Sequence, residues 1–223
     1  MLSFTPWEPS RQLRVLAVGA HADDVEIGAG GVLLQLVQSV PDLCVDVLVL
    51  TGTPTRADEA RASADAFLDG VEHTVSTHAL PDGRLPSAWA DVKQLLEDRA
   101  RTRPGPDLLI GPSRDESHQD HRVVAEILPT VFRDALTLSY EIPKSDGDLV
   151  RRSHYVPMTD EVASRKADLL MQHFPSQHGR HWYDREVFLA VARLRGAECG
   201  SRYAEAFTCV KSVLTFQGGK GSS

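Results

Sequence analysis

The stretch Arg14-Val15-Leu16-Ala17-Val18-Gly19-Ala20-His21-Ala22-Asp23-Asp24 places a histidine and two carboxylates directly after an apolar run of strand length. Such a run, followed by a helical pattern, predicts a buried strand that ends where a helix begins. In open α/β sheets, ligands bind at this edge, beyond the carboxyl ends of the strands. The sequence therefore predicts functional side chains at the end of the first strand of an α/β fold.

The same arrangement returns later in the chain. Asp107-Leu108-Leu109-Ile110-Gly111 predicts another buried strand, and His118-Gln119-Asp120-His121 follows it. Imidazole together with carboxylate is a normal ligand set for Zn²⁺ or Fe²⁺. Two such clusters at two strand ends predict one metal-centred site built from distant parts of the chain.

Apolar runs of strand length alternate with segments of helical period, which is typical of βαβ units around a parallel sheet. We expect strands near Arg14–Gly19, Leu43–Thr51, Glu72–Ser76, Asp107–Pro112, Thr137–Glu141 and Phe207–Phe216. We expect helices near Glu26–Ser39, Ala57–Phe67, Ala88–Arg101, His121–Phe132, Asp160–His173 and Asp184–Leu194. The predicted fold is a single-domain α/β fold over residues 1–217, with a mostly parallel sheet flanked by helices and a disordered tail at 218–223.

The composition sets limits on the class of protein. The 223 residues are 42% hydrophobic and 25% charged, which fits a soluble protein with one sizeable core. The net charge of −7 does not indicate a nucleic-acid-binding surface. No stretch reaches the ~18 apolar residues of a membrane span, and the first residues lack the apolar region of a signal peptide. With three cysteines and no CxxC pair, the sequence predicts a cytoplasmic protein and leaves homo-oligomerisation open.

The spacing of the polar residues suggests different chemical roles for them in the site. His21 and Asp24 are close enough in sequence to reach one ion, and either His118 or His121 supplies a third ligand. Three protein ligands with an open position are what a hydrolytic metal site requires. Asp23 is then available as a general base, and the remaining histidine can stabilise an oxyanion or protonate the leaving nitrogen. Asp120 lies between the histidines and can orient one of them.

Simpler explanations exist for each residue taken alone. Carboxylates at a helix start commonly cap it, and a single histidine in a loop is commonly a surface residue. The glycines of Gly28-Ala29-Gly30-Gly31 do not match the dinucleotide fingerprint GxGxxG, so we expect them to pack a helix closely against the sheet. No GxSxG motif points to a serine nucleophile. The clustering of five such residues at two strand ends favours the metal site.

Two motifs also resemble a known family. Ala20-His21-Ala22-Asp23-Asp24 is similar to the AHPDD signature of the PIG-L/LmbE-like N-acetylglucosaminyl deacetylases, and His118-Gln119-Asp120-His121 resembles their HPDH motif. Arg195-Gly196 and Tyr203-Ala204-Glu205-Ala206-Phe207 resemble the family's C-terminal pattern. The resemblance implies a Rossmann-like fold and a single metal ion, usually zinc, although Fe²⁺ or another divalent cation stays open. By motif position, the implied metal ligands are His21, Asp24 and His121, the general base is Asp23, and His118 stabilises the oxyanion or acts as acid.

Further positions follow from the resemblance. Arg56-Ala57-Asp58-Glu59 and Asp82-Gly83 resemble family segments in which the arginine and the aspartate contact the substrate. The alternatives are an exposed helix start at Arg56 and a simple turn at Asp82. Alanine and glutamine replace the usual prolines of the two motifs, and residues 140–148 and 176–183 differ from the thiol-pathway deacetylases.

The implied function is zinc-dependent removal of an N-acetyl group from a small molecule that contains an amino sugar. Two alternatives stay open. One is an amidase for a bulkier amide or a thiol conjugate, and the other is a non-catalytic metal-binding module of the same fold.

Overall fold

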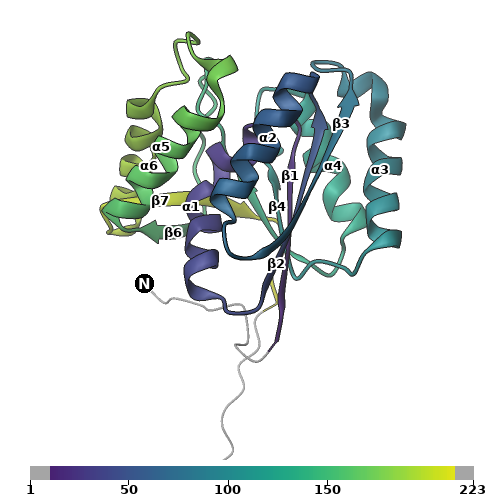
Figure 1. The fold of residues 1–223 in the computed structure, drawn as a ribbon, viewed down its shortest axis with the longest axis horizontal. Helices are drawn as coiled ribbons and strands as arrows, with labels where there is room; N and C mark the ends of the chain where they lie inside the picture. The colour runs from purple at the N-terminus through teal and green to yellow at the C-terminus, as the bar shows by residue number, and fades with distance from the viewer. Residues whose placement is uncertain (1–10, 214–223) are drawn as a thin grey trace, which may run out of the picture.

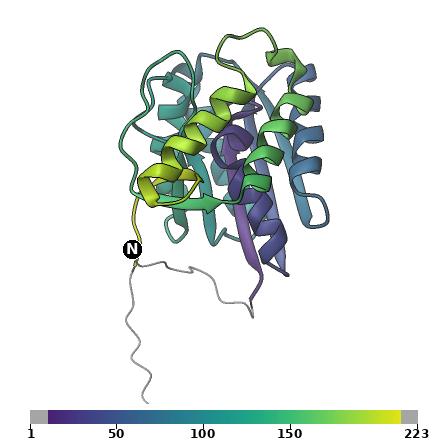
Figure 2. The ribbon, with the colours of Figure 1, turned by 90° about the vertical axis from the view of Figure 1, so that its left-hand side faces the viewer.

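The computed structural model describes residues 11–213, which form one sheet with helices on both faces (Figures 1 and 2). The strand order is β3-β2-β1-β4-β5-β7-β6. The parallel strands are β1 (Leu13–Gly19), β2 (Leu43–Thr51), β3 (Glu72–Leu80), β4 (Leu108–Pro112) and β5 (Leu136–Tyr140). β7 (Tyr203–Cys209) runs antiparallel to β5, and β6 (His154–Met158) runs antiparallel to β7. The predicted single-domain α/β fold with a mostly parallel sheet is confirmed.

The helices divide between the two faces of the sheet (Figure 1). One face carries α1 (Asp24–Ser39), α2 (Pro54–Phe67), α5 (Asp160–His173) and α6 (Arg185–Cys199). The other carries α3 (Trp89–Thr102) and α4 (Gln119–Val131), which pack against each other. Figure 2 shows α5 and α6 side by side at the front.

The strand order explains why the two motifs meet. The chain leaves β1 through α1 toward β2 on one side, and later returns through α3 to place β4 on the other side of β1. The strand order therefore reverses between β1 and β4. At such a point in an α/β sheet, the loops that follow the two neighbouring strands lead away from each other and leave a crevice in which ligands bind. Ala17 is paired with Ile110 in the parallel register, so the loops carrying the two motifs leave the sheet side by side.

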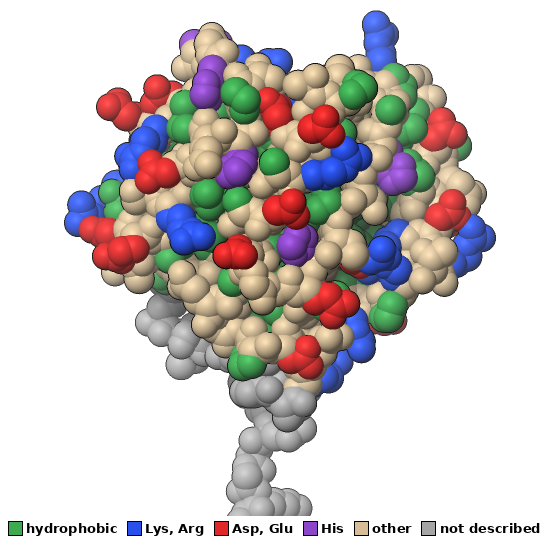
Figure 3. All heavy atoms as spheres, viewed as in Figure 1, with side chains coloured by type: hydrophobic (Ala, Val, Ile, Leu, Met, Phe, Trp, Pro, Cys, Tyr) green, Lys and Arg blue, Asp and Glu red, His purple; other side chains and the backbone are tan. Residues whose placement is uncertain are grey.

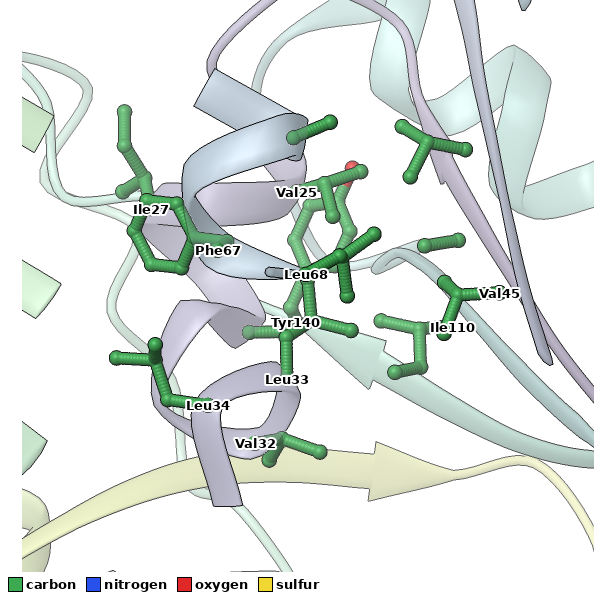
Figure 4. Packing of buried hydrophobic residues seen from close by; sticks show 14 of the residues in the cluster. Val25, Ile27, Val32, Leu33, Leu34, Val45, Phe67, Leu68, Ile110 and Tyr140 are labelled. Atoms are coloured by element: carbon green, nitrogen blue, oxygen red, sulfur yellow. The ribbon is translucent and has the colours of Figure 1, made fainter. Parts of the chain in front are cut away.

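The glycines of α1 bring this helix close to its neighbours. A Cβ at Gly28 would lie 2.4 Å from Cγ of Tyr140, and one at Gly31 would lie 2.1 Å from Sδ of Met158. Tyr140 is fully buried, and its hydroxyl donates a 2.9 Å hydrogen bond to the carbonyl of Val18 at the end of β1. It packs with Val25 and other apolar side chains of the main core (Figure 4). The close-packing explanation of these glycines is confirmed.

Two residues of the C-terminal segments quoted above, Arg195 and Glu205, have structural roles. Glu205 on β7 accepts hydrogen bonds of 2.7 Å from the backbone N–H groups of Gly31 and Val32 in α1, and its carboxylate pairs with Lys166. Arg195 on α6 donates to the buried carboxylate of Glu141 at 2.7 Å. These charged residues are buried and paired, so they hold α1, α5 and α6 to the antiparallel side of the sheet.

Several elements differ from the sequence-based expectation. β3 extends to Leu80 instead of ending at Ser76, and α6 extends to Cys199 instead of ending at Leu194. The last strand covers Tyr203–Cys209 and not Phe207–Phe216, because its partners β5 and β6 pair only with residues up to Cys209. Residues 214–216 and the predicted tail lie outside the described residues. β6 was not predicted, since its five residues include Pro157 and form an edge strand that is stabilised only by pairing with β7.

No helix within residues 11–213 is both long and apolar enough to cross a membrane. On the face shown in Figure 3, acidic, basic and apolar side chains are interspersed.

Candidate metal centre

The first motif forms the loop between β1 and α1. Asp23 occupies the N-cap position of α1, but its side chain makes no capping hydrogen bond. The carboxylate of Asp24 turns back and accepts a 2.8 Å hydrogen bond from the backbone N–H of His21. The hydroxyl of Thr51, at the end of β2, donates to the carbonyl of Ala20 at 2.7 Å and ties the loop to the sheet. Capping of α1 therefore does not account for the two carboxylates.

The second motif forms the start of α4. His118 is the N-cap of this helix, and its Nδ1 accepts a 3.3 Å hydrogen bond from the backbone N–H of Asp120. This contact leaves Nε2 of a neutral His118 as the nitrogen that carries the proton. His121, in the first turn, is completely buried.

Three donor atoms from the two motifs converge. Nδ1 of His21 lies 3.1 Å from Nε2 of His121, and both nitrogens lie close to Oδ2 of Asp24, at 3.3 and 3.2 Å respectively. A tetrahedral zinc ion with bonds of about 2.0–2.1 Å requires its ligands to be roughly 3.3–3.4 Å apart. The observed triangle therefore has nearly the size of one face of such a tetrahedron.

Carboxylates on the outer sides of the His21 and His121 rings also favour a metal site. Nε2 of His21 faces Asp82 at 3.1 Å and Asp120 at 3.4 Å, and Nδ1 of His121 is hydrogen-bonded to Glu116. Each neutral imidazole has one proton, and these carboxylates draw it to the outer nitrogen. With the outer nitrogens protonated, a cation at the centre would be bound through the inner nitrogens and Asp24. Two imidazoles and a carboxylate at this spacing are a normal ligand set for Zn²⁺ or Fe²⁺, so the residues present fit a divalent metal ion.

The electrostatics of the site agree with this donor set. Burial opposes protonation of His21 and His121, but Asp24 and the other carboxylates outweigh it and raise the pKa of His21 to about 12 and that of His121 to about 9. The same negative potential attracts a divalent cation, which would take the place of the second proton on each ring. His118 behaves differently, because burial and the neighbouring histidines lower its pKa to about 4.

His118 lies beside this triangle. Its ring centroid is 4.8 Å from that of His21 and 5.0 Å from that of His121. Donor atoms of these three histidines all lie within 4.8 Å of one another, so His118 borders the same site. The short distances within the triangle, and the use of Nδ1 of His118 as a helix cap, favour His121 as the third ligand.

Asp23 and Arg56 form the centre of a second network. Nη2 of Arg56 lies 2.6 Å from Oδ1 of Asp23, and Nη1 lies 2.9 Å from Glu59 and 3.2 Å from Oγ of Ser176. Ser176 also donates its N–H and its hydroxyl to Glu59, at 2.8 and 2.6 Å. The guanidinium carbon of Arg56 lies over the ring of Phe174, 5.4 Å from its centroid. Burial raises the pKa of Asp23, and the positive charge of Arg56 opposes this shift.

The remaining predicted site residues also lie at this edge of the sheet. Asp120 is buried, and its carboxylate accepts hydrogen bonds from the N–H groups of Gly83 and Leu85 at 2.7 and 3.0 Å. It faces His21, whereas we expected it to orient a histidine of its own motif. The side chain of Asp82 is 73% exposed and reaches His21 from the loop after β3.

Sequence reasoning missed Glu116, Phe174 and Ser176. Glu116 is acidic and only two residues before His118, which was the available signal. Ser176 lies within the divergent segment 176–183, but nothing in its sequence points to Arg56. The histidines of that segment lie elsewhere, since His178 contacts the carbonyl of Met171 and His181 contacts Ser145.

Fold and donor set together define a Rossmann-like α/β protein with a candidate metal centre at the carboxyl edge of its sheet. The sequence model of the PIG-L family, described as GlcNAc-PI de-N-acetylase, matches residues 16–132. The chain therefore belongs to the PIG-L family, and the resemblance noted in the two motifs is confirmed.

Several solved structures share the fold at low sequence identity. N,N'-diacetylchitobiose deacetylase from Pyrococcus horikoshii is 19% identical with a TM-score of 0.66, over 90% of this chain and 85% of that one. A deacetylase of teicoplanin biosynthesis, in complex with teicoplanin, is 18% identical with a TM-score of 0.64, over 90% and 100%. GalB from Pseudomonas putida KT2440, a 4-carboxy-2-hydroxymuconate hydratase, is 16% identical with a TM-score of 0.73, over 92% and 99%. Because these proteins differ in activity, the shared fold alone does not decide the reaction.

Proposed function

We propose that this protein is a metal-dependent N-deacetylase that hydrolyses the acetamide of an amino-sugar-containing small molecule to a free amine and acetate. The observation that carries the proposal is the convergence of His21, Asp24 and His121 on one point, with Asp23 and His118 beside it. Membership of a family described as a de-N-acetylase supports the choice of reaction. In this proposal residues 1–217 form one catalytic domain.

The metal ligands in this proposal are His21, Asp24 and His121. A divalent cation, zinc in the first instance and Fe²⁺ or another ion as the alternative, supplies Lewis-acid activation of the amide carbonyl and of the attacking water when it is bound there. The protein contributes the donors, their spacing and the carboxylates that hold the outer nitrogens protonated.

Asp23 acts as the general base. It removes a proton from the attacking water as the water oxygen adds to the amide carbon. Asp23 then transfers this proton to the amide nitrogen, which leaves as the free amine when the C–N bond breaks. Arg56 holds the carboxylate of Asp23 in one orientation through a 2.6 Å contact. This contact supports a positioning role for Arg56 in addition to the substrate contact that the family resemblance implies.

His118 stabilises the oxyanion. The backbone N–H of Asp120 occupies its Nδ1, so the Nε2–H of the neutral ring is the group available for donation. Such a donor contributes to catalysis when it points to where negative charge develops. Its tautomer favours hydrogen-bond donation over proton transfer to the leaving amine.

Asp82 is the residue proposed to bind sugar hydroxyls. Its carboxylate is exposed beside His21, so it can accept hydrogen bonds from a ligand at the metal centre. Asp120 supports the loop that presents Asp82, since it binds the backbone N–H groups of Gly83 and Leu85.

The test is hydrolysis of a panel of N-acetylated amino sugars, free and conjugated, by the zinc-loaded protein, with the free amine and acetate measured by mass spectrometry. Bulkier amides and thiol conjugates in the same panel distinguish the amidase alternative. A protein that binds one zinc ion per chain but releases no amine from any compound would instead be a non-catalytic metal-binding module. The variant Asp23→Asn serves as the control for background hydrolysis.

A further inference from the structure

Glu116 contacts the metal centre from outside the two motifs. It lies in the loop between β4 and α4, and its carboxylate oxygen Oε2 is hydrogen-bonded to Nδ1 of His121. Glu116 is only 2% exposed, and His121 is completely buried. The contact is therefore shielded from water, where a charge-assisted hydrogen bond is stronger than at the surface.

The ring of His121 has two carboxylates competing for its proton. Glu116 lies at Nδ1, and Asp24 lies 3.2 Å from Nε2. If the single proton of the neutral ring sat on Nε2, His121 would donate to Asp24 and could not bind a cation through that nitrogen. With a cation on the inner side, the carboxylate at Nδ1 would hold the remaining proton on the outer side, and Nε2 would be the nitrogen that binds.

The charge of Glu116 is supported from a second loop. Nζ of Lys144, in the segment after β5, lies 3.7 Å from Oε2 of Glu116, and the lysine side chain is largely buried. The neighbouring loop is held by Asp148, which accepts a 2.6 Å hydrogen bond from the N–H of Ser117. The second oxygen, Oε1 of Glu116, is buried with no hydrogen-bond partner within residues 11–213. Burying a carboxylate costs free energy, and the contact with His121 is the main hydrogen bond that the carboxylate of Glu116 makes in return.

We propose that Glu116 is a positioning residue of the metal centre, which sets the tautomer and orientation of His121 so that Nε2 binds the cation. The inference rests on the proposed metal-dependent function, and it gives the divergent segment 140–148 a role, since Lys144 supports Glu116 from there. It also explains why an acidic residue outside the two motifs is buried in this loop.

The experiment measures zinc affinity of the purified protein by competition with a chromophoric chelator, and ligand geometry from the visible absorption of the Co²⁺-loaded form. Glu116→Gln removes the charge with little change in shape, and Glu126→Gln is the matched control because Glu126 is exposed on α4. We expect Glu116→Gln to weaken zinc binding by about 10–100-fold and to alter the Co²⁺ spectrum, while the control keeps both. Glu116→Asp keeps the charge but shortens the side chain, so its affinity should fall between those of the wild type and Glu116→Gln.

The outcomes separate the two proposals. A wild-type protein that binds no zinc would overturn the metal centre and the role of Glu116 together. A wild type that binds one zinc ion, with wild-type affinity and spectrum in Glu116→Gln, would overturn the role of Glu116 alone. Near-UV circular dichroism of the zinc-free variants reports folding. If Glu116→Gln is unfolded, Glu116→Asp decides, and wild-type affinity in that variant contradicts the inference.

Discussion

The cation of Arg56 should be important for stability as well as for catalysis. Asp23 and Glu59 are 5% and 8% exposed, and Arg56 makes an ion pair with each of them, with its own side chain 15% exposed. Arg56→Met keeps much of the aliphatic length that packs near Phe174 but removes the charge. Two buried carboxylates then lose their counter-charge, and breaking a buried pair in this way costs about 3–5 kcal/mol. Because Arg56 is partly exposed and Glu59 keeps its hydrogen bonds to Ser176, we expect about 3 kcal/mol.

A matched control lies on the same helix. Arg61 also pairs with an acidic residue three positions away, Asp58, but the side chains are 49% and 79% exposed. Exposed pairs of this kind contribute roughly 0–1 kcal/mol, so Arg61→Met should change stability little. Urea unfolding of the zinc-free proteins, followed by tryptophan fluorescence, measures both changes. If the free energies of unfolding of the two variants agree to within about 1 kcal/mol, the assignment of a buried, charge-compensating role to Arg56 is wrong.

Three further substitutions test the site and the core. Asp23→Asn should retain zinc but lower kcat by about 10²–10⁴-fold, measured as amine release, and full activity would exclude Asp23 as the base. His121→Ala should reduce the zinc content far below one per chain by elemental analysis, and stoichiometric zinc in this variant would exclude His121 as a ligand. Gly28→Ala should destabilise the protein by about 1–3 kcal/mol although alanine favours helices, because the new Cβ would overlap the buried ring of Tyr140. Gly105→Ala, where no atom lies within 4 Å of the new Cβ, should stay within about 0.5 kcal/mol, and equal unfolding midpoints for the two alanine variants would contradict the packing argument.

Elements with strong local signals were predicted well. The expected bounds Leu43–Thr51 for β2 and Asp160–His173 for α5 agree with the structure. β2 is apolar except for Asp46 and Thr51, as expected for a strand covered on both faces. α5 begins after Thr159, whose side chain accepts a hydrogen bond from the N–H of Val162, as an N-cap residue does. β6, by contrast, depends on pairing with β7, so its five residues have little local signal.

The candidate site was likewise predicted only in part from the sequence. The sequence pointed to His21, Asp24 and a pair of histidines, because these residue types follow two predicted strands. The sequence did not decide whether His118 or His121 is the third ligand. Both histidines lie at the start of one helix, and their spacing alone does not show which of them faces the ion. The contact of Asp120 with His21 was not expected either, because it depends on how the loop after β3 packs on α4.

Apolar periodicity, helix caps and the order of motifs are properties of the chain itself, and they were sufficient to predict an α/β sheet and the two loops that carry the chemistry. The tertiary structure alone decided which nitrogen of each imidazole faces Asp24, and which distant side chains, Glu116 and Ser176 among them, support the centre. The physical reason is that a strand or helix is selected by neighbouring residues, whereas hydrogen-bond geometry to within a few tenths of an ångström depends on how separate elements pack.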